Sequence, residues 1–219
     1  MGRPEARAEA RKLKQCLLAC GVPEVSLELM QGRPADGDEW NNQFVVTDMA
    51  HHTVSRYSRS NLTPCLALVK SGRSDLQGPL CNGYGGWDLC ARIITLGYAN
   101  HPGFGGPLTV PSGVKSPPNY TIPKDNARRY AFGWEFEGGL AEADWNLTLK
   151  NPRGKGKPMT FREFMARCLN GTQMMYNLPL GAHTEHKTWA PQRKVDRMGY
   201  TLARAKAEMQ KVRPADQRP

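Results

Sequence analysis

A short segment near the C-terminus gathers side chains that can bind a metal ion and stabilise negative charge. It has the sequence HTEHKTWAPQRKVD and contains His183, His186, Lys194 and Asp196. Imidazole and carboxylate groups are both good zinc ligands. A lysine beside a metal adds positive charge to a positive centre, which makes sense if it faces an oxyanion formed during a reaction. The segment therefore suggests part of a hydrolytic metal site.

The other three histidines of the chain lie at the ends of predicted structural elements. Residues 44–49 have the β-branched and apolar composition of a central strand, and His51 and His52 follow it directly. His101 lies in the glycine-rich segment 100–106. Strand ends and loops are where a rigid scaffold presents functional side chains. Either member of the pair at 51 and 52 could instead be a surface residue or a hydrogen-bonded core histidine.

A second candidate strand, residues 129–139, carries two carboxylates. Apolar residues alternate here with small or charged ones, which places Glu135 and Glu137 on the same face. A carboxylate on an otherwise apolar strand is costly to bury, so a function would explain it. The competing interpretation is a strand edge that faces solvent.

Together these residues supply the parts of a catalytic zinc site. Such a site has three protein ligands and a fourth position for water, with a nearby carboxylate to accept the proton of the water and a cation to stabilise the tetrahedral intermediate. His186 and Asp196 are too far apart for one helix face and would meet across a loop.

The rest of the chain predicts the elements that position these groups. Helices are expected at 4–20, 160–176 and 200–212, the second beginning with the capping box Thr160-Phe-Arg-Glu163. Further strands are expected at 66–70 and 89–98, with a hairpin turn at 71–75. The proline-rich stretch 107–125 predicts an extended loop, which at this length is typical of a segment that lines a site.

Composition narrows the function classes. The chain has 219 residues, is 39% hydrophobic and carries a net charge of +10, so it can form a core and attract polyanions such as nucleic acid, anionic lipid or acidic wall polymers. We find no helix-turn-helix or lysine–aromatic sheet face, so we expect no specific nucleic-acid partner. No apolar run is long enough to cross a bilayer, so we expect no membrane insertion.

The six cysteines have no metal-site spacing and are expected to be mostly buried thiols, although Cys65, Cys81 and Cys90 could include a disulfide.

Four motifs resemble those of zinc-dependent N-acetylmuramoyl-L-alanine amidases with the peptidoglycan-recognition fold. The segment from His186 to Asp196 resembles the family's histidine-to-aspartate segment, in which Ala-Pro-Gly-Arg-Lys-Thr-Asp-Pro follows the histidine. The sequence FGWEFEG at 132–138 resembles the family strand Gly-Ile-Glu-Leu-Glu-Gly. His51-His52-Thr53 resembles the first ligand motif, and Asn100-His101-Pro-Gly is similar to a cleft loop with Trp-His-Ala-Gly. The resemblance spans about residues 44–199 and departs from the family at Gln192 and Arg197, which replace glycine and proline.

The resemblance implies an α/β fold in which a central mixed β-sheet is flanked by helices. It implies a Zn²⁺ ion on His51, His186 and Asp196, with His52 as the alternative to His51. It further implies Glu135 as the base that activates water and Lys194 as the oxyanion-stabilising cation. His101, His183 and His52 would contact substrate or support the site. The expected domains are an N-terminal helix and loop extension at 1–40, a zinc amidase catalytic domain at 41–212 and a tail at 213–219.

The function implied is hydrolysis of the amide between N-acetylmuramic acid and L-alanine in peptidoglycan, in a monomeric phage endolysin that lyses its host. Because the charged N-terminus lacks the apolar centre of a secretory signal, we expect synthesis in the host cytoplasm and action on the wall after release. Two alternatives stay open: a zinc peptidase that cuts within the stem peptide, and a non-catalytic peptidoglycan-binding module.

Overall fold

The structure is a computed structural model that describes residues 4–30, 45–111, 119–139, 141–191 and 201–214. Lys194, expected to stabilise the oxyanion, and Asp196, expected to bind zinc, lie outside these ranges. So do Gln192 and Arg197, the two departures from the family motif.

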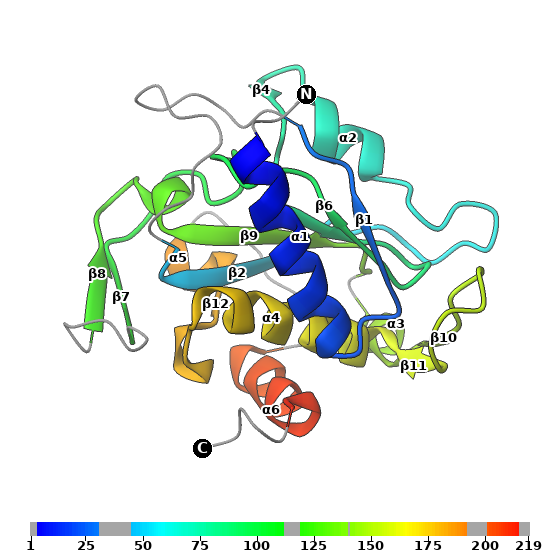
Figure 1. Ribbon diagram of the computed structural model, residues 1–219. Helices are drawn as coiled ribbons and strands as arrows, with labels where there is room; N and C mark the ends of the chain where they lie inside the picture. Colours follow the sequence, from blue (N-terminus) through cyan, green and yellow to red (C-terminus); the bar gives the residue numbers. More distant parts are fainter. Residues whose placement is uncertain (1–3, 31–44, 112–118, 140, 192–200, 215–219) are drawn as a thin grey trace.

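A six-stranded mixed sheet forms the centre of the molecule. Its strands lie in the order β1-β6-β5-β9-β2-β12. Neighbouring strands are parallel except β5 and β6, which pair as antiparallel. The bounds are β1 Glu24–Leu27, β2 Thr47–His52, β5 Gly83–Gly85, β6 Cys90–Ile93, β9 Ala131–Phe136 and β12 Thr184–Glu185. With helices on its faces, this sheet confirms the predicted fold class (Figure 1).

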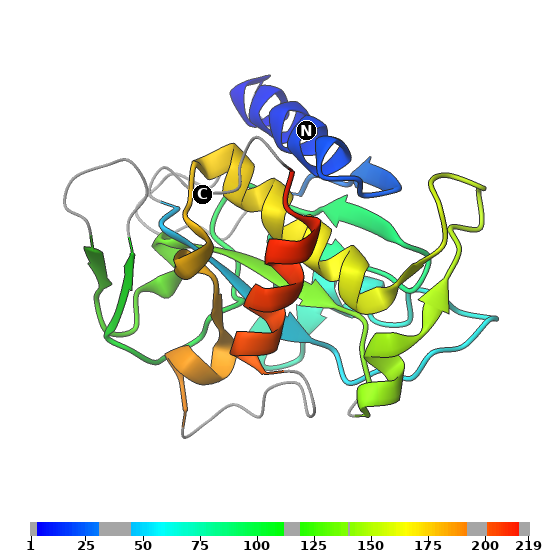
Figure 2. The same cartoon turned by 90° about the horizontal axis from the view of Figure 1, so that it is seen from below.

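Two long helices, α1 Pro4–Ala19 and α4 Phe161–Tyr176, cover one face of the sheet (Figure 2). The third, α6 Leu202–Val212, packs against α4 beyond the β12 edge of the sheet, so α4 contacts both of the others (Figure 1). The layers are seen edge-on in Figure 2, with α1 and α4 on one side of the sheet and the short helix α5 (His186–Trp189) on the other. The core between sheet and helices is aromatic: the Phe136 ring meets Phe161 and Phe164 of α4 edge to face. Burial of such rings is a major source of stability.

Local sequence signals define the helices well. Thr160 caps α4 by accepting a hydrogen bond from the Glu163 backbone N–H at 3.2 Å, as the capping box predicts. The helix ends at Tyr176, and its C-cap Asn177 adopts a left-handed conformation (φ +53°). The three predicted helices are therefore confirmed, with starts or ends shifted by up to two residues. The N-terminal 40 residues contribute α1 and the edge strand β1 to the same core and sheet.

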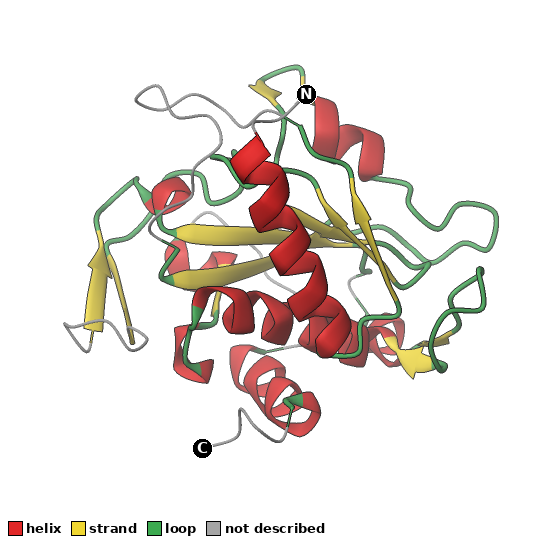
Figure 3. Ribbon diagram, in the orientation of Figure 1, coloured by secondary structure: helices red, strands yellow, loops and turns green. Residues whose placement is uncertain are grey.

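Two sequence-based predictions of secondary structure were wrong. The predicted strand at 66–70 is the helix α2 (Leu66–Ser71), because a short apolar run such as the four residues 66–69 does not distinguish strand from helix by periodicity. The predicted loop 107–125 contains an antiparallel ribbon of β7 (Leu108–Pro111) and β8 (Asn119–Ile122), which stands apart at one end of the sheet (Figure 3).

The remaining elements are short. A hairpin lies near the turn predicted at 71–75, but the turn itself is Ser74–Asp75, between β3 Gly72–Arg73 and β4 Leu76–Gln77. Others are α3 Glu142–Asn146, β10 Thr148–Leu149, β11 Met159–Thr160 and the 3₁₀ turns η1 Ala127–Arg129 and η2 Leu180–Ala182. All six cysteines lie in the described ranges and are free thiols, so the suggested disulfide is not formed. No helix in the described part of the chain is long and apolar enough to span a membrane.

Candidate active site

The site is built where two parallel strands present polar side chains on the sheet face opposite α4. In the β2–β9 register, His51 lies beside Glu135, so both side chains point to the same face. His51 Nδ1 lies 3.3 Å from Glu135 Oε1. The two side chains are 18% and 14% exposed, which leaves them accessible to solvent and substrate.

Two further imidazoles complete the cluster from other parts of the chain. His101 Nε2 lies 3.4 Å from the same oxygen, Glu135 Oε1. The rings of His101 and His186 are stacked, with centroids 4.6 Å apart and planes only 8° from parallel. The His51 and His186 centroids are also 4.6 Å apart, in an edge-on arrangement. The fold thus brings together three of the predicted histidines around the predicted base.

The position of His101 depends on the absence of a side chain at Gly133 in β9. A Cβ atom there would lie 2.4 Å from two atoms of the His101 ring, well inside van der Waals contact. Asn82 links this strand to the segment that leads to His101. Its Oδ1 accepts from the Gly133 N–H at 2.9 Å, and its Nδ2 donates to the Gly97 carbonyl at 2.8 Å. Asn82 is buried, and sequence reasoning did not identify it.

His186 is held through the short helix that it begins. Trp189 at the end of α5 donates its indole N–H to the Gly103 carbonyl at 3.1 Å, and its own carbonyl accepts from the Gly106 N–H at 2.8 Å. These bonds join α5 to the loop that carries His101. The two stacked rings, His101 and His186, therefore come from two segments that are hydrogen-bonded to each other.

The electrostatics favour an ionised Glu135. Burial by itself would raise the pKa of its carboxyl group. The positive potential of His51 and hydrogen bonds from His101 and His51 outweigh burial and hold the pKa well below its usual range. An ionised carboxylate beside imidazole rings can accept a proton from a water molecule or hold a ring in a chosen orientation.

Glu137, on the same face as Glu135, is instead fully enclosed by donors. It accepts hydrogen bonds from the hydroxyls of Thr53, Ser55 and Tyr84, and from the Cys65 backbone N–H at 2.8 Å. These contacts anchor the loop that leaves β2 just after the two histidines. Burial and the adjacent Glu137 charge raise the pKa of the Tyr84 hydroxyl, which keeps it a donor.

Tyr84 is a site neighbour that sequence reasoning left unassigned. It lies in register with Glu135 across the β5–β9 pair. Its signal in the sequence was a bulky aromatic between two glycines, Gly83-Tyr84-Gly85, at a strand position.

Two predicted site histidines point away from the cluster. His52 faces the α4 side, is 1% exposed, and its Nδ1 lies 3.1 Å from the Gly138 carbonyl. His183 is 0% exposed, and its Nδ1 lies 2.7 Å from Asp48 Oδ2. This burial does not agree with a substrate-contacting role for either histidine, and it leaves His51 as the member of the first pair that faces Glu135. Period-two alternation along β2 is the physical reason that only one of the pair can do so.

The described residues supply two of the three ligands expected for a zinc site. His51 and His186 offer the imidazole donors that zinc favours. Within the described ranges, no group of three or more His, Cys, Asp or Glu side chains is arranged to hold a metal ion. The third expected ligand, Asp196, lies outside those ranges.

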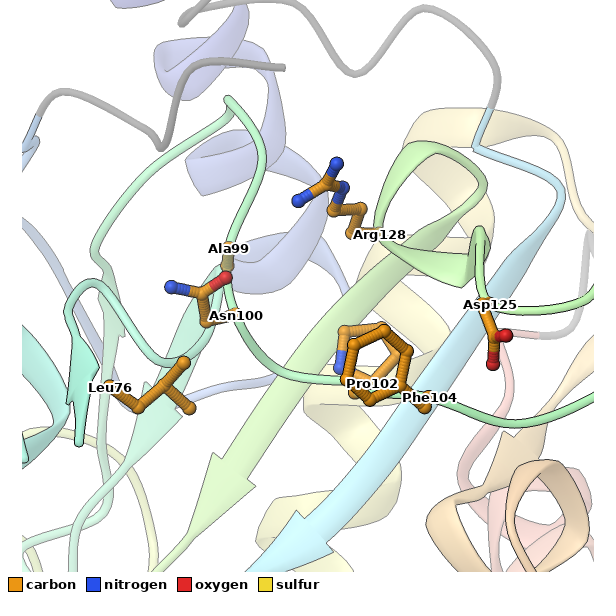
Figure 4. Close-up of a pocket in the computed structure, with 8 residues that line it drawn as sticks. Leu76, Ala99, Asn100, Pro102, Phe104, Asp125 and Arg128 are labelled. Carbon is orange, nitrogen blue, oxygen red and sulfur yellow. The ribbon is translucent and has the colours of Figure 1, made fainter.

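A cavity of about 190 Å³ lies beside the loop that carries His101. Its lining combines Leu76 and Phe104 with the polar side chains of Asn100 and Arg128 (Figure 4). Phe104 is 67% exposed and also borders a second, more open hollow of about 490 Å³ next to α5. Hollows that combine apolar lining residues with a few polar groups are where small ligands usually bind.

No protein-family model matches the sequence, and no curated protein matches it. Two solved structures resemble the fold. A selenomethionine derivative of AmpD has a TM-score of 0.52 and 12% sequence identity, over 86% of this chain and 95% of that one. The endolysin N-acetylmuramoyl-L-alanine amidase LysCS from Clostridium intestinale URNW has a TM-score of 0.46 and 12% identity, over 87% of this chain and 97% of that one. At this identity, the likeness to AmpD shows that the chain shares its fold.

Proposed function

We propose that the protein is a zinc-dependent peptidoglycan amidase that hydrolyses the amide between N-acetylmuramic acid and L-alanine. One observation carries the proposal: His51, Glu135 and His186, distant in sequence, meet on one face of the sheet, where His51 and Glu135 are partly exposed and His186 is buried. These are residues of the three motifs that resemble the ligand and base motifs of zinc amidases. The fold that the chain shares with AmpD supports the same assignment.

The residues that would hold zinc are His51, His186 and Asp196. A zinc ion there would supply Lewis acidity, polarising an amide carbonyl and making a water molecule acidic enough to lose its proton near neutral pH. The remaining steps depend on the chain's own groups.

Glu135 is the group proposed to take the proton of the attacking water and return it to the leaving amine. Its carboxylate is ionised and lies at the centre of the cluster, within 3.4 Å of two imidazoles. His101 orients this carboxylate and covers one side of the site, since its ring is buried against Gly133. Lys194 is proposed to stabilise the oxyanion of the tetrahedral intermediate.

The hollows beside Phe104 are proposed to hold the part of the substrate that extends from the cleaved amide. The loop 101–106 carries both His101 and Phe104, so a chain bound at the cluster can continue across the exposed ring. Arg128 at the rim can bind a carboxylate of the stem peptide. We also propose that the protein acts on the bacterial wall as a phage endolysin, after release from the cell that makes it.

The deciding experiment is product analysis on purified peptidoglycan. Zinc-loaded protein should release new L-alanine amino termini without new reducing ends, and Glu135→Gln should abolish this release. Glu163→Gln, which alters a partly buried carboxylate at the start of α4, serves as the matched control. Amino termini of other residues would identify a stem-peptide peptidase instead. Zinc binding and wall binding without any new terminus would identify a binding module.

A further inference from the structure

The segment that carries His186 is attached to the sheet by very little backbone. β12 has two residues in register with β2, Thr184 opposite Met49 and Glu185 opposite Ala50. It is also the last strand of the sheet, so it has a neighbour on one side. Such a short edge pairing specifies its register weakly through backbone bonds alone.

Side-chain hydrogen bonds also attach this segment to β2 on the face of the sheet that carries the site. Thr47 Oγ1 donates a hydrogen bond to the Ala182 carbonyl at 2.5 Å and lies 3.0 Å from Thr184 Oγ1. Thr47 is fully buried and Thr184 is 4% exposed, so water does not compete for these bonds.

A second set of polar contacts holds the segment on the opposite face of the sheet, toward α4. His183 Nδ1 lies 2.7 Å from Asp48 Oδ2, and both side chains are 0% exposed. The other oxygen, Asp48 Oδ1, accepts from Gln173 Nε2 of α4 at 2.9 Å. Helix α6 also contributes, because Lys206 Nζ donates to the Gly181 carbonyl at 3.1 Å.

These contacts discriminate between registers. Alternation places His183 and Glu185 on the α4 face and Thr184 and His186 on the site face. A slip of one residue would reverse every side chain and turn His186 away from His51. It would also leave Asp48 Oδ2 buried without its His183 partner, and an unpaired buried polar atom is costly.

We propose that Asp48 and His183, with Gln173 and the Thr47–Thr184 pair, form a polar register lock that positions His186 opposite His51. They are positioning residues, since they act through His186 and do not touch substrate. The inference rests on the proposed function for the role of His186. The register itself is measurable without metal or substrate.

Stability alone does not account for a buried polar cluster of this kind. Replacing a buried ion pair by apolar residues of similar volume is often neutral or stabilising. Buried polar groups are best attested as devices that select one arrangement among several. If this cluster fixes the register, replacing its polar side chains by apolar ones should keep the fold but lose the register between β12 and β2.

The test uses the triple variant Asp48→Leu/Gln173→Met/His183→Leu, which removes all three polar partners together. In zinc-free protein, NMR should detect contacts between the His51 and His186 rings, whose centroids are 4.6 Å apart, and between Thr184 and Met49. We expect both contacts to be lost in the variant while cooperative thermal unfolding is kept. We expect zinc affinity to fall by roughly 10–100-fold, the usual effect of losing groups that orient ligands.

The matched control is Asn170→Leu, which removes another buried polar side chain of α4, one bonded to the Met209 carbonyl. It should keep both NMR contacts. If the triple variant also keeps them, the lock is refuted. If the triple variant does not fold, the isosteric double variant Thr47→Val/Thr184→Val replaces it in the same NMR measurement. We expect the double variant to lose both contacts. If it keeps them, the proposal is overturned. Wild-type protein that binds no zinc would refute the proposed function and leave this comparison intact.

Discussion

The substitution Gly133→Ala tests whether the position of His101 matters for the reaction. The added Cβ would lie 2.4 Å from His101 Cγ and Nδ1, whereas ordinary contacts begin near 3.4 Å. The ring must therefore move by about 1 Å, which disturbs its contact with Glu135 and its stack with His186. A misplacement of about 1 Å in a reactive cluster can cost roughly 100-fold in rate, and we expect a loss of that order in kcat. Overpacking should also lower stability by about 1–3 kcal/mol.

The assay is the initial rate at which amino termini appear in purified peptidoglycan, measured together with thermal unfolding. Gly181→Ala is the matched control, because its added Cβ would meet Pro111 Cγ at 3.1 Å, outside the histidine cluster. It should keep nearly full activity.

A double-mutant cycle gives the sharpest refutation. If Gly133→Ala acts by displacing the ring, it should cost little further activity in a His101→Ala background. Full activity of Gly133→Ala, or an equal loss in both backgrounds, would refute the reasoning.

Three other predictions follow from the same geometry. Glu135→Gln should lower kcat by at least about 100-fold with a smaller change in KM, as expected for loss of a general base, and equal activity of variant and wild type would exclude that role. Phe104→Ala and Arg128→Gln should each raise KM several-fold and leave kcat and the unfolding temperature unchanged; an unchanged KM on intact peptidoglycan would place the substrate elsewhere. Glu24 is buried, and burial would raise its pKa, but hydrogen bonds from Asn151, Lys155 and Arg153 lower the pKa to about 2. Since its folded pKa lies below the unfolded value, ionised Glu24 stabilises the protein above about pH 4.5. This stabilisation is lost as the pH falls toward 2. Glu24→Gln should therefore cost about 1–2 kcal/mol at pH 7, after allowance for screening at its exposed partners, and the difference from wild type should vanish by about pH 2 in urea titrations. A difference independent of pH would contradict this.

Local physical chemistry made much of the fold predictable. Helix α4 is specified by its capping box and by an apolar face, and both signals lie within a few residues of each other. The strand β9 is specified by alternation, which also placed Glu135 and Glu137 on one face. The five-residue run at 66–70 was misassigned because nothing local distinguishes a short apolar helix from a strand.

The site shows where local reasoning ends. Sequence alone determined which residue types could do the chemistry: five histidines, a glutamate on an apolar strand, and a motif with lysine and aspartate. It did not determine which histidine faces which way, because alternation fixes opposite faces without saying which one α4 covers. Only the packing of α4 decided that His51 faces Glu135 and His52 does not. Likewise, His183 is in the same short segment as His186, yet its partner Asp48 is 135 residues away. That contact exists because β12 pairs with β2, and strand pairing over such a separation depends on the whole chain and not on its local pattern.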